Sequence, residues 1–198
     1  MTTADYLDGL LLCYSGNFDI YQPYRINNKK YPAYGYFFSV VEKYILVREI
    51  NMWSTRSYEH ILFMEVDTCT EKTIEEASDI IKNYMEPMLV RKGEKLPEPN
   101  HMYSYLNVAI ICRKPVEKKI ADRIKRFHFE KGYKFNIRGF SKGSIMCVSI
   151  EDQKYISNYQ GRSKRKLFQQ VFSAVSAGKP GFSTILKEKG LTPFQQES

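Results

Sequence analysis

The sequence lacks the residue patterns that mark several classes of protein. Its four cysteines are far apart with no C-x-x-C pair, and its three histidines show no metal-ligand spacing. We therefore expect reduced, buried thiols and neither a zinc site nor another metal centre. No stretch approaches the roughly 18 apolar residues that a membrane-spanning helix needs. The first apolar run is short and is flanked by Asp5 and Asp8, unlike a signal peptide, so we expect a cytoplasmic protein that does not enter a membrane.

The motifs that usually announce phosphate binding or a catalytic nucleophile are also missing. The chain has no G-x-x-x-x-G-K-[ST], no G-x-G-x-x-G after a predicted strand, no G-x-S-x-G and no H-E-x-x-H. These absences give no reason to expect a cofactor, and they favour a protein that is not an enzyme.

Aromatic and basic residues are what the chain has in quantity. It contains 15 Tyr and 12 Phe in 198 residues, and its formal net charge is +8. Tyrosine has an apolar body and a polar tip, so these rings suit half-buried sheet faces. A basic balance of this size suggests a nucleic acid or an acidic protein as partner.

Hydrophobic periodicity predicts a mixture of helices and strands. A capped first helix is followed by β-branched and aromatic segments, and the second half alternates strands with helices. The predicted strands are 18–26, 34–41, 44–53, 58–66, 102–112, 133–138, 144–150 and 154–159. The predicted helices are 3–16, 68–88, 115–131 and 162–176.

The order of these elements predicts one α+β domain over residues 1–176. It begins with the N-terminal helix and an antiparallel four-strand meander, and it continues with βα units on a mixed sheet with helices packed against it. Residues 102–112 are almost continuously apolar, which is typical of a strand buried on both faces. The C-terminal tail, 177–198, is expected to be either docked or flexible.

Two basic clusters are the candidate binding surface. One lies in the predicted helix and strand between 113 and 138, a segment that contains ten Lys and Arg but only three Asp and Glu. The other is at the start of the last predicted helix. Cations interspersed with tyrosines suit phosphate contacts and base stacking. The predicted binding residues are Lys118, Lys119, Arg123, Arg126, Lys134, Arg162, Lys164, Arg165 and Lys166.

An α-β-β-β-α-β order resembles the core of the restriction-endonuclease-like PD-(D/E)xK nucleases. That resemblance implies a metal-dependent site with Glu49 on one strand and Glu65 and Asp67 at the end of another. The chain has Glu65-Val66-Asp67 where the motif has acid-x-Lys, so a lysine would have to come from the next helix, as Lys72 or Lys82. The ordinary alternative is that these acids are solvated at a strand end.

The segments RFHFEKGYKFNIRGF at 126–140 and YISNYQGR at 155–162 resemble an uncharacterised family of small bacterial cytoplasmic proteins. The similarity extends to about Phe168 and implies a single bacterial domain without an assigned activity. Three hypotheses follow: a non-catalytic binding protein with a basic surface, a divergent metal-dependent nuclease, and a homodimer formed through an exposed strand edge.

Overall fold

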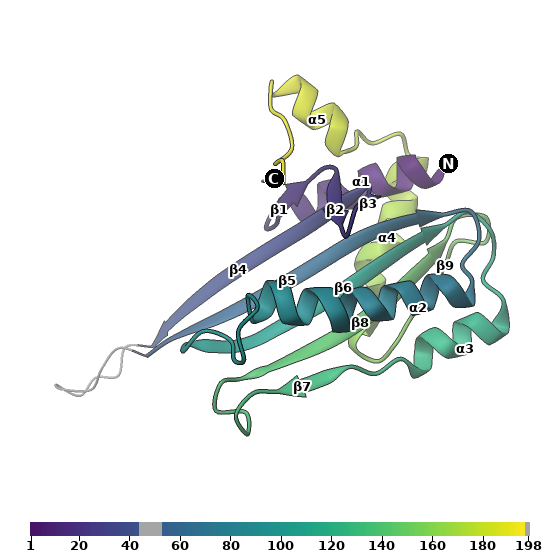
Figure 1. Ribbon diagram of the computed structural model, residues 1–198. Helices are drawn as coiled ribbons and strands as arrows, with labels where there is room; N and C mark the ends of the chain where they lie inside the picture. Colours follow the sequence, from purple (N-terminus) through teal and green to yellow (C-terminus); the bar gives the residue numbers. More distant parts are fainter. Residues whose placement is uncertain (44–52, 197–198) are drawn as a thin grey trace.

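The computed structural model describes residues 1–43 and 53–196 (Figure 1). Its helical segments are α1 (Thr3–Ser15), α2 (Glu71–Asp79), the π-helix η1 (Ile80–Val90), α3 (Lys118–Arg126), the 3-10 segment η2 (Gln160–Lys164), α4 (Arg165–Ser176) and α5 (Phe182–Glu188). Its strands are β1 (Asp19–Tyr21), β2 (Tyr24–Ile26), β3 (Lys29–Tyr31), β4 (Ala33–Lys43), β5 (Trp53–Val66), β6 (His101–Cys112), β7 (Glu130–Gly132), β8 (Phe140–Ser149) and β9 (Lys154–Ser157).

A mixed seven-stranded sheet forms the middle of the molecule. Its order is β1-β4-β5-β6-β8-β7, and β9 pairs with β8 beyond the end of β7. The β1–β4 and β4–β5 pairs are antiparallel, whereas β5–β6 and β6–β8 are parallel. The predicted α+β class, N-terminal helix, four-strand antiparallel start and mixed sheet are confirmed.

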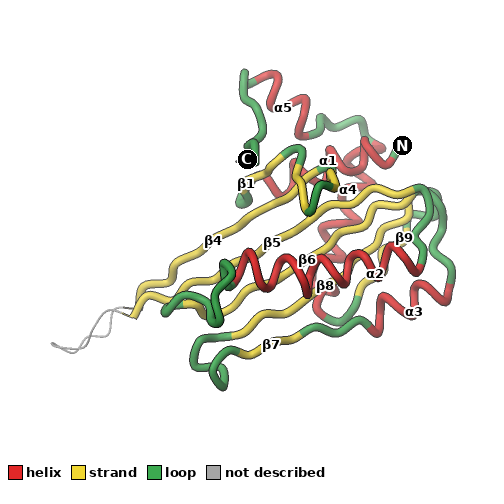
Figure 2. Tube along the Cα trace, viewed as in Figure 1, coloured by secondary structure: helices red, strands yellow, loops and turns green. Residues whose placement is uncertain are grey.

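Helices cover both faces of the sheet (Figure 2). On one face, α2, η1, α3 and the small β2–β3 hairpin bury Leu62, Leu106 and Val108. On the other, α1 and α4 bury Phe63 and Ala109, whose side chains alternate with the first set. Strand β6 is buried on both faces through its second half, as the continuous apolar run predicts.

The antiparallel start differs from the predicted strands in its details. The expected strand 18–26 is divided at Pro23, which has no N–H for a ladder, into β1 and β2. Residues 54–57, which separate the predicted strands 44–53 and 58–66, are part of the long β5. The expected strand 44–53 and the candidate Glu49 lie, apart from Trp53, outside the described residues.

Two further expectations in the second half are wrong. Residues 133–138 form a tight turn rather than a strand, because Lys134, Phe135 and Asn136 all take positive φ angles of 48°, 54° and 65°. Residues 139–143, which lie between the predicted strands 133–138 and 144–150, are mostly strand, since β8 begins at Phe140. The tail is in contact with the domain: Phe182 is buried, and Asp8 accepts hydrogen bonds from the Ser183 backbone and hydroxyl, both at 2.8 Å.

A buried carboxylate fixes the end of η1 to the edge of the sheet. Glu86 is 2% exposed and accepts hydrogen bonds from Arg91 at 2.7 Å and Tyr133 at 3.0 Å, and it pairs with Lys131 at 3.0 Å. Burial raises the pKa of Glu86, but the hydrogen bonds from Arg91, Lys131 and Tyr133 outweigh it, so the pKa lies below its ordinary value. A buried charge is tolerated only with such partners.

Two phenylalanines provide a test of this packing. Phe168 of α4 is fully buried with its ring 5.0 Å from that of Tyr155, whereas Phe135 is 98% exposed. We expect Phe168→Ala to lower the free energy of unfolding by about 3–5 kcal/mol, and Phe135→Ala to change it by less than about 0.5 kcal/mol. Chemical denaturation followed by circular dichroism measures both, and equal midpoints for the two variants would contradict the described core.

Candidate functional site

One half of a sheet face is left without a helix. Helices α1 and α4 cover the part that contains Phe63, Ala109 and Met146. Nearer the amino-terminal ends of β6 and β8, side chains on this same face belong to neither core cluster. We call this region the open half-face, and define it by the residues Glu59, Tyr103, Tyr105, Phe140 and Lys142.

The strand register places these five side chains together. Glu59 is opposite Tyr105, which is opposite Lys142, and Tyr103 is opposite Phe140. Residues in register on neighbouring strands point to the same side of a sheet, and all five are half-buried. The open half-face is therefore a continuous surface across three strands.

Its aromatic rings form a strip that ends at a cation. The ring centroids of Tyr103 and Tyr105 are 5.2 Å apart, and Tyr103 and Phe140 are stacked at 6.1 Å. The ammonium nitrogen of Lys142 lies 5.0 Å from the centroid of the Phe140 ring. The same ammonium group pairs with Glu130 at 3.5 Å, so its charge is balanced in part.

The segment η2 forms a wall beside the open half-face because it lies very close to the sheet. A Cβ atom on Gly161 would be 2.7 Å from Ser144 Oγ and 2.8 Å from Ser157 Cβ, so only glycine fits. Asn158 holds the segment by donating hydrogen bonds to the Gly143 and Phe127 carbonyl oxygens, at 3.0 and 3.2 Å. The chain after Gly161 therefore enters α4 directly above the strands.

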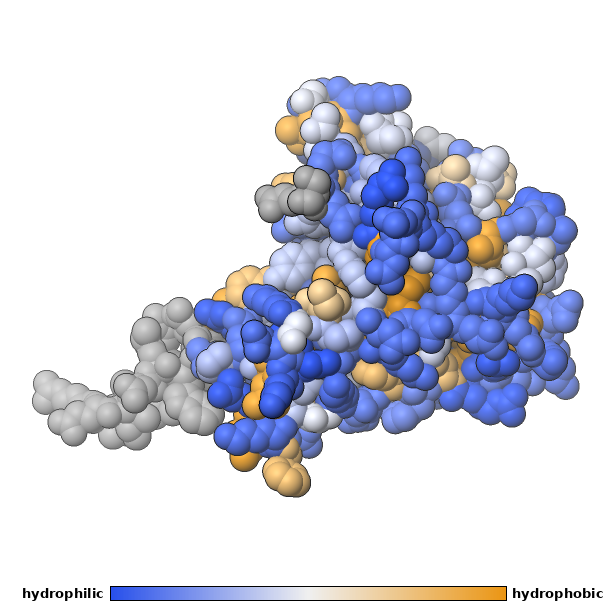
Figure 3. All heavy atoms as spheres, viewed as in Figure 1, coloured by the Kyte–Doolittle hydropathy of each residue, from blue (hydrophilic) through white to orange (hydrophobic). Residues whose placement is uncertain are grey.

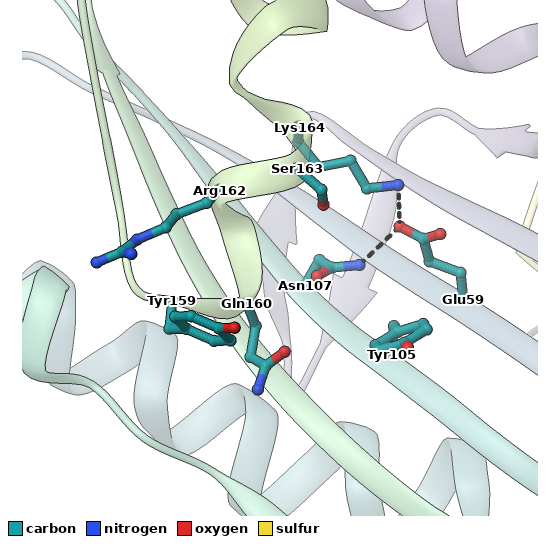
Figure 4. A pocket seen from close by; sticks show the side chains of 8 residues that line it. All are labelled: Glu59, Tyr105, Asn107, Tyr159, Gln160, Arg162, Ser163 and Lys164. Atoms are coloured by element: carbon teal, nitrogen blue, oxygen red, sulfur yellow. Dashed lines mark hydrogen bonds and ion pairs between the residues drawn. The ribbon is translucent and has the colours of Figure 1, made fainter.

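A cavity of about 470 Å³ lies between this wall and the sheet (Figure 4). Lys164 reaches across from η2 and pairs with Glu59 Oε1 at 2.6 Å. Asn107 Nδ2 donates to the same oxygen at 3.0 Å. The lining residues are Glu59, Tyr105, Asn107, Tyr159, Gln160, Arg162, Ser163 and Lys164.

Three cations of η2 and the first turn of α4 are exposed and without an ion pair in the described residues. They are Arg162, Arg165 and Lys166. The guanidinium of Arg162 lies 5.2 Å from the ring of Tyr159, which is itself 72% exposed. Of the predicted binding residues, Arg162 and Lys164 line the cavity. Arg165 and Lys166 follow in the first turn of α4, where the Arg165 guanidinium lies 5.8 Å from the ring of Tyr155.

The predicted binding residues on α3 are in a different situation. Lys119 pairs with Glu71 at 2.8 Å, and Arg123 pairs with Glu75 at 3.2 Å, so α3 is neutralised in part by α2. Lys118 and Arg126 are exposed on the same helix. Polar and charged side chains dominate the surface over α2 and α3 (Figure 3).

The two clusters are consequently not one surface. Helix α3 packs on the face of the sheet opposite to α4. Lys134 is in the turn between β7 and β8, apart from both helices.

The described nuclease candidates are Glu65, Asp67, Lys72 and Lys82, and each has its own surroundings. Asp67 accepts hydrogen bonds from Arg113 at 2.6 Å and pairs with Lys114 at 2.9 Å, and these cations lower its pKa to about 2, Lys114 having the larger effect. Glu65 is exposed at the end of β5. Lys72 belongs to α2 and lines a separate hollow with Glu76.

Lys82, the other candidate, has its ammonium group 5.9 Å from the Phe127 ring. Across residues 1–43 and 53–196, no three His, Cys, Asp or Glu side chains are grouped so that they could hold a metal ion.

One pattern in the sequence does indicate part of the open half-face. Within 102–112, tyrosine or asparagine occupies alternate positions at Tyr103, Tyr105 and Asn107, ahead of an apolar second half. Alternation of this kind indicates a strand with one polar or half-exposed face. Glu59, Phe140 and Lys142 carry no such local pattern, and only the strand register brings them to the site.

Comparison with known proteins places the chain in a family. Residues 2–170 match the model of a family described as a domain of unknown function, DUF8052. The chain belongs to this family. No curated protein and no solved structure matches it. The match covers all of η2 and the first half of α4, so the candidate site lies within it. No helix in the described part of the chain is long and apolar enough to cross a membrane.

Gly161 gives a test of the wall. We expect Gly161→Ala to lower the free energy of unfolding by about 1–3 kcal/mol, because the new methyl group overlaps atoms of β8 and β9. Gly16→Ala is the control, since Gly16 has φ −66° and no atom within 4 Å of the added Cβ. Thermal denaturation compares them, and a Gly161→Ala protein as stable as the control would disprove the close approach.

Proposed function

We propose that this protein is a non-catalytic binding protein and that it holds single-stranded nucleic acid on the open half-face. The observation that carries the proposal is the aromatic strip of Tyr103, Tyr105 and Phe140. It accompanies η2 and the first turn of α4, which carry the exposed cations Arg162, Arg165 and Lys166. Bases stack on aromatic side chains with a gain of about 1–3 kcal/mol each, whatever their sequence. Lysine and arginine at the border of such a strip bind the phosphates that connect the bases.

A single strand fits this surface better than a duplex does. The half-buried rings of the strip lie next to one another across β6 and β8. The bases of a duplex are already stacked on one another, whereas those of a single strand are free to stack on protein.

The cellular setting we propose is the bacterial cytoplasm. The four cysteines support it, since none is in a disulfide and three are buried. Thiols of this kind are typical of a reducing compartment.

The strip and the wall are tested with labelled oligouridine in fluorescence anisotropy. We expect Tyr105→Ala with Phe140→Ala to weaken binding by about 1–3 kcal/mol per lost base contact. We expect Arg162→Gln, Arg165→Gln and Lys166→Gln together to reduce the slope of log affinity against log salt by about 0.7 for each lost phosphate contact. The matched control is Lys118→Gln, Lys119→Gln and Arg126→Gln on the opposite face.

Each result has a definite meaning. A larger loss from the α3 control than from the wall variant would move the binding surface to α3. Loss from the charge variants without any loss from the aromatic variants would show that oligouridine is held by charge alone, and it would reject base stacking on the strip. No binding at low salt would reject the nucleic-acid proposal.

A homodimer is a second proposal, favoured by the outer edge of β4. Strand β1 pairs only with Tyr34, Gly35 and Tyr36 of β4, and no other described strand pairs with the outer edge beyond them. Phe38 and Val40 are 42% and 43% exposed there. Unpaired backbone groups with exposed apolar side chains favour strand addition by a second copy.

Light scattering after size exclusion tests this edge. We expect a mass twice that of the chain, and we expect Val40→Lys to give the monomer because a buried lysine opposes pairing. Met102→Lys, at a residue 46% exposed outside β4, is the control and retains the dimer. A monomeric wild-type protein at high concentration would reject the dimer.

A further inference from the structure

We propose that the turn between β7 and β8, residues 134–138, is a second arm of the nucleic-acid site, and that Phe135 stacks on a base beyond the aromatic strip. This inference rests on the proposed function and extends the binding surface to a part of the chain outside the open half-face. Three features support it: the direction in which the turn folds, the exposure of its side chains and their charge.

The turn folds toward the side of the sheet that carries the open half-face. Gly132 of β7 is opposite Phe140 of β8 in the antiparallel register, so a side chain at position 132 would point to the same side as the Phe140 ring. On that side the space is already occupied, because a Cβ atom on Gly132 would lie 3.2 Å from Asn136 Cγ. Asn136 is therefore folded back over the end of β7, next to the Phe140 end of the strip.

Backbone hydrogen bonds fix the turn in this direction. The Tyr133 N–H donates to the Gly139 carbonyl oxygen at 2.9 Å, and the Arg138 N–H donates to the Tyr133 carbonyl oxygen at 3.1 Å. The ring nitrogen Nδ1 of His101 lies 2.9 Å from the Arg138 carbonyl oxygen and connects the turn to β6. Residues 134–136 all take positive φ angles, which are unfavourable outside glycine and persist where the surrounding structure imposes them, often at binding sites.

The apolar side chains of the turn are not part of the core. Phe135 is 98% exposed and Ile137 is 74% exposed, at the end of the β7–β8 pair (Figure 2). A ring with this exposure contributes nothing to the packing of the protein alone. Its face is open to a partner, and every base has a flat face on which such a ring can stack.

The charge of the turn suits a polyanion. Between Tyr133 and Phe140 the chain contains Lys134 and Arg138 and no acid, and Lys134 is exposed. Five peptide units join Phe135 to Phe140, so their Cα atoms are at most roughly 17 Å apart. About five nucleotides span that distance at the spacing of a stacked strand. A strand that leaves the strip at Phe140 therefore reaches the turn, where Lys134 is placed to bind a phosphate.

Dependence on strand length distinguishes the turn from the strip. Fluorescence anisotropy with the full chain measures affinity for labelled oligouridines of about 4 to about 16 nucleotides, the range of known single-strand sites. We expect Phe135→Ala to weaken binding of the longest strands about fivefold to a hundredfold, the contribution of one stacked base. The shortest strands should stay within about twofold of wild type, because the strip and the cations of η2 and α4 hold them. Each variant is compared with wild type at the same length, so the gain from additional binding registers cancels.

Two further substitutions at position 135 separate stacking from general apolar contact. Phe135→Tyr keeps an aromatic ring, and we expect it to bind long strands within about twofold of wild type. Phe135→Leu keeps an apolar side chain without a ring, and we expect it to bind them as weakly as Phe135→Ala. The matched control is Phe194→Ala, since Phe194 is 55% exposed and lies beside Tyr21 of β1, at the opposite edge of the sheet. It keeps the wild-type affinity at every length, and circular dichroism melting verifies the fold of all four variants.

The outcomes separate this inference from the proposed function. Binding of long strands that Phe135→Ala does not weaken overturns the second arm while the proposed function stands. An equal loss for short and long strands also overturns the second arm, because Phe135 would then belong to the main binding surface. Loss from Phe135→Ala without any loss from Tyr105→Ala with Phe140→Ala supports the turn and overturns the strip. Absence of binding to every strand overturns both.

Two results would assign the turn to another partner. Full affinity of Phe135→Leu for long strands overturns base stacking, because any apolar contact would then suffice. The turn could also meet an anionic lipid surface, since exposed apolar and basic side chains together suit one. Sedimentation with vesicles of anionic phospholipid tests this. If Phe135→Ala abolishes sedimentation and leaves oligouridine binding unchanged at every length, the turn binds lipid and the second arm is overturned.

Discussion

The structure depends on burial of β5, β6 and β8 between two helical layers of unequal length. Strand β6 has 12 residues, and at about 3.3 Å per residue it spans roughly 40 Å. On one face the continuous run of α2 and η1 occupies residues 71–90 and extends over most of that distance. On the other face α1 and α4, of 13 and 12 residues, span only about 20 Å each. The amino-terminal half of the strands is left uncovered on that side.

The unequal cover explains why the open half-face is aromatic and not simply polar. Its reverse side is core: Leu106 lies between Tyr105 and Asn107 and is fully buried. The strand must therefore remain rigid and well paired, and tyrosine fits such a position because its ring packs on the sheet while its hydroxyl reaches water. The same pleat fixes the direction of every ring, so the strip is preorganised without a ligand.

Local sequence patterns predicted the parts of the fold that local physics determines. The apolar run of β6, the capped α1 and the helix after Gly161 were all foreseeable from 3.6-residue and 2-residue periods. Residues 133–138 mislead because Tyr133, Phe135 and Ile137 alternate as in a strand. In the structure only Tyr133 is buried, while Phe135 and Ile137 are 98% and 74% exposed on a left-handed turn.

The candidate site was foreseeable in its charges and in the alternating Tyr103, Tyr105 and Asn107 of β6, but not as one assembled surface. The Arg162–Lys166 cluster is visible in the sequence, but which cations are neutralised depends on distant partners, as when Lys119 pairs with Glu71. Likewise, Glu59 and Lys142 become neighbours of Tyr105 only through the β5–β6 and β6–β8 registers. Long-range pairing is what local patterns in the sequence do not reveal.

The position of the site also follows from what occupies the opposite end of the sheet. In open α/β sheets, ligands usually bind beyond the carboxyl ends of the parallel strands. Here Arg113 closes that end by pairing with Asp67 and Glu151, both at 2.6 Å, and Lys114 adds a third pair. These exposed pairs contribute little to stability, but they satisfy the acids that a metal site would need. That end of the sheet is therefore occupied by its own ion pairs, and the other face is covered by η1. The uncovered amino-terminal half is the part of the described sheet where Tyr103, Tyr105 and Phe140 are half-exposed and Arg162 is near.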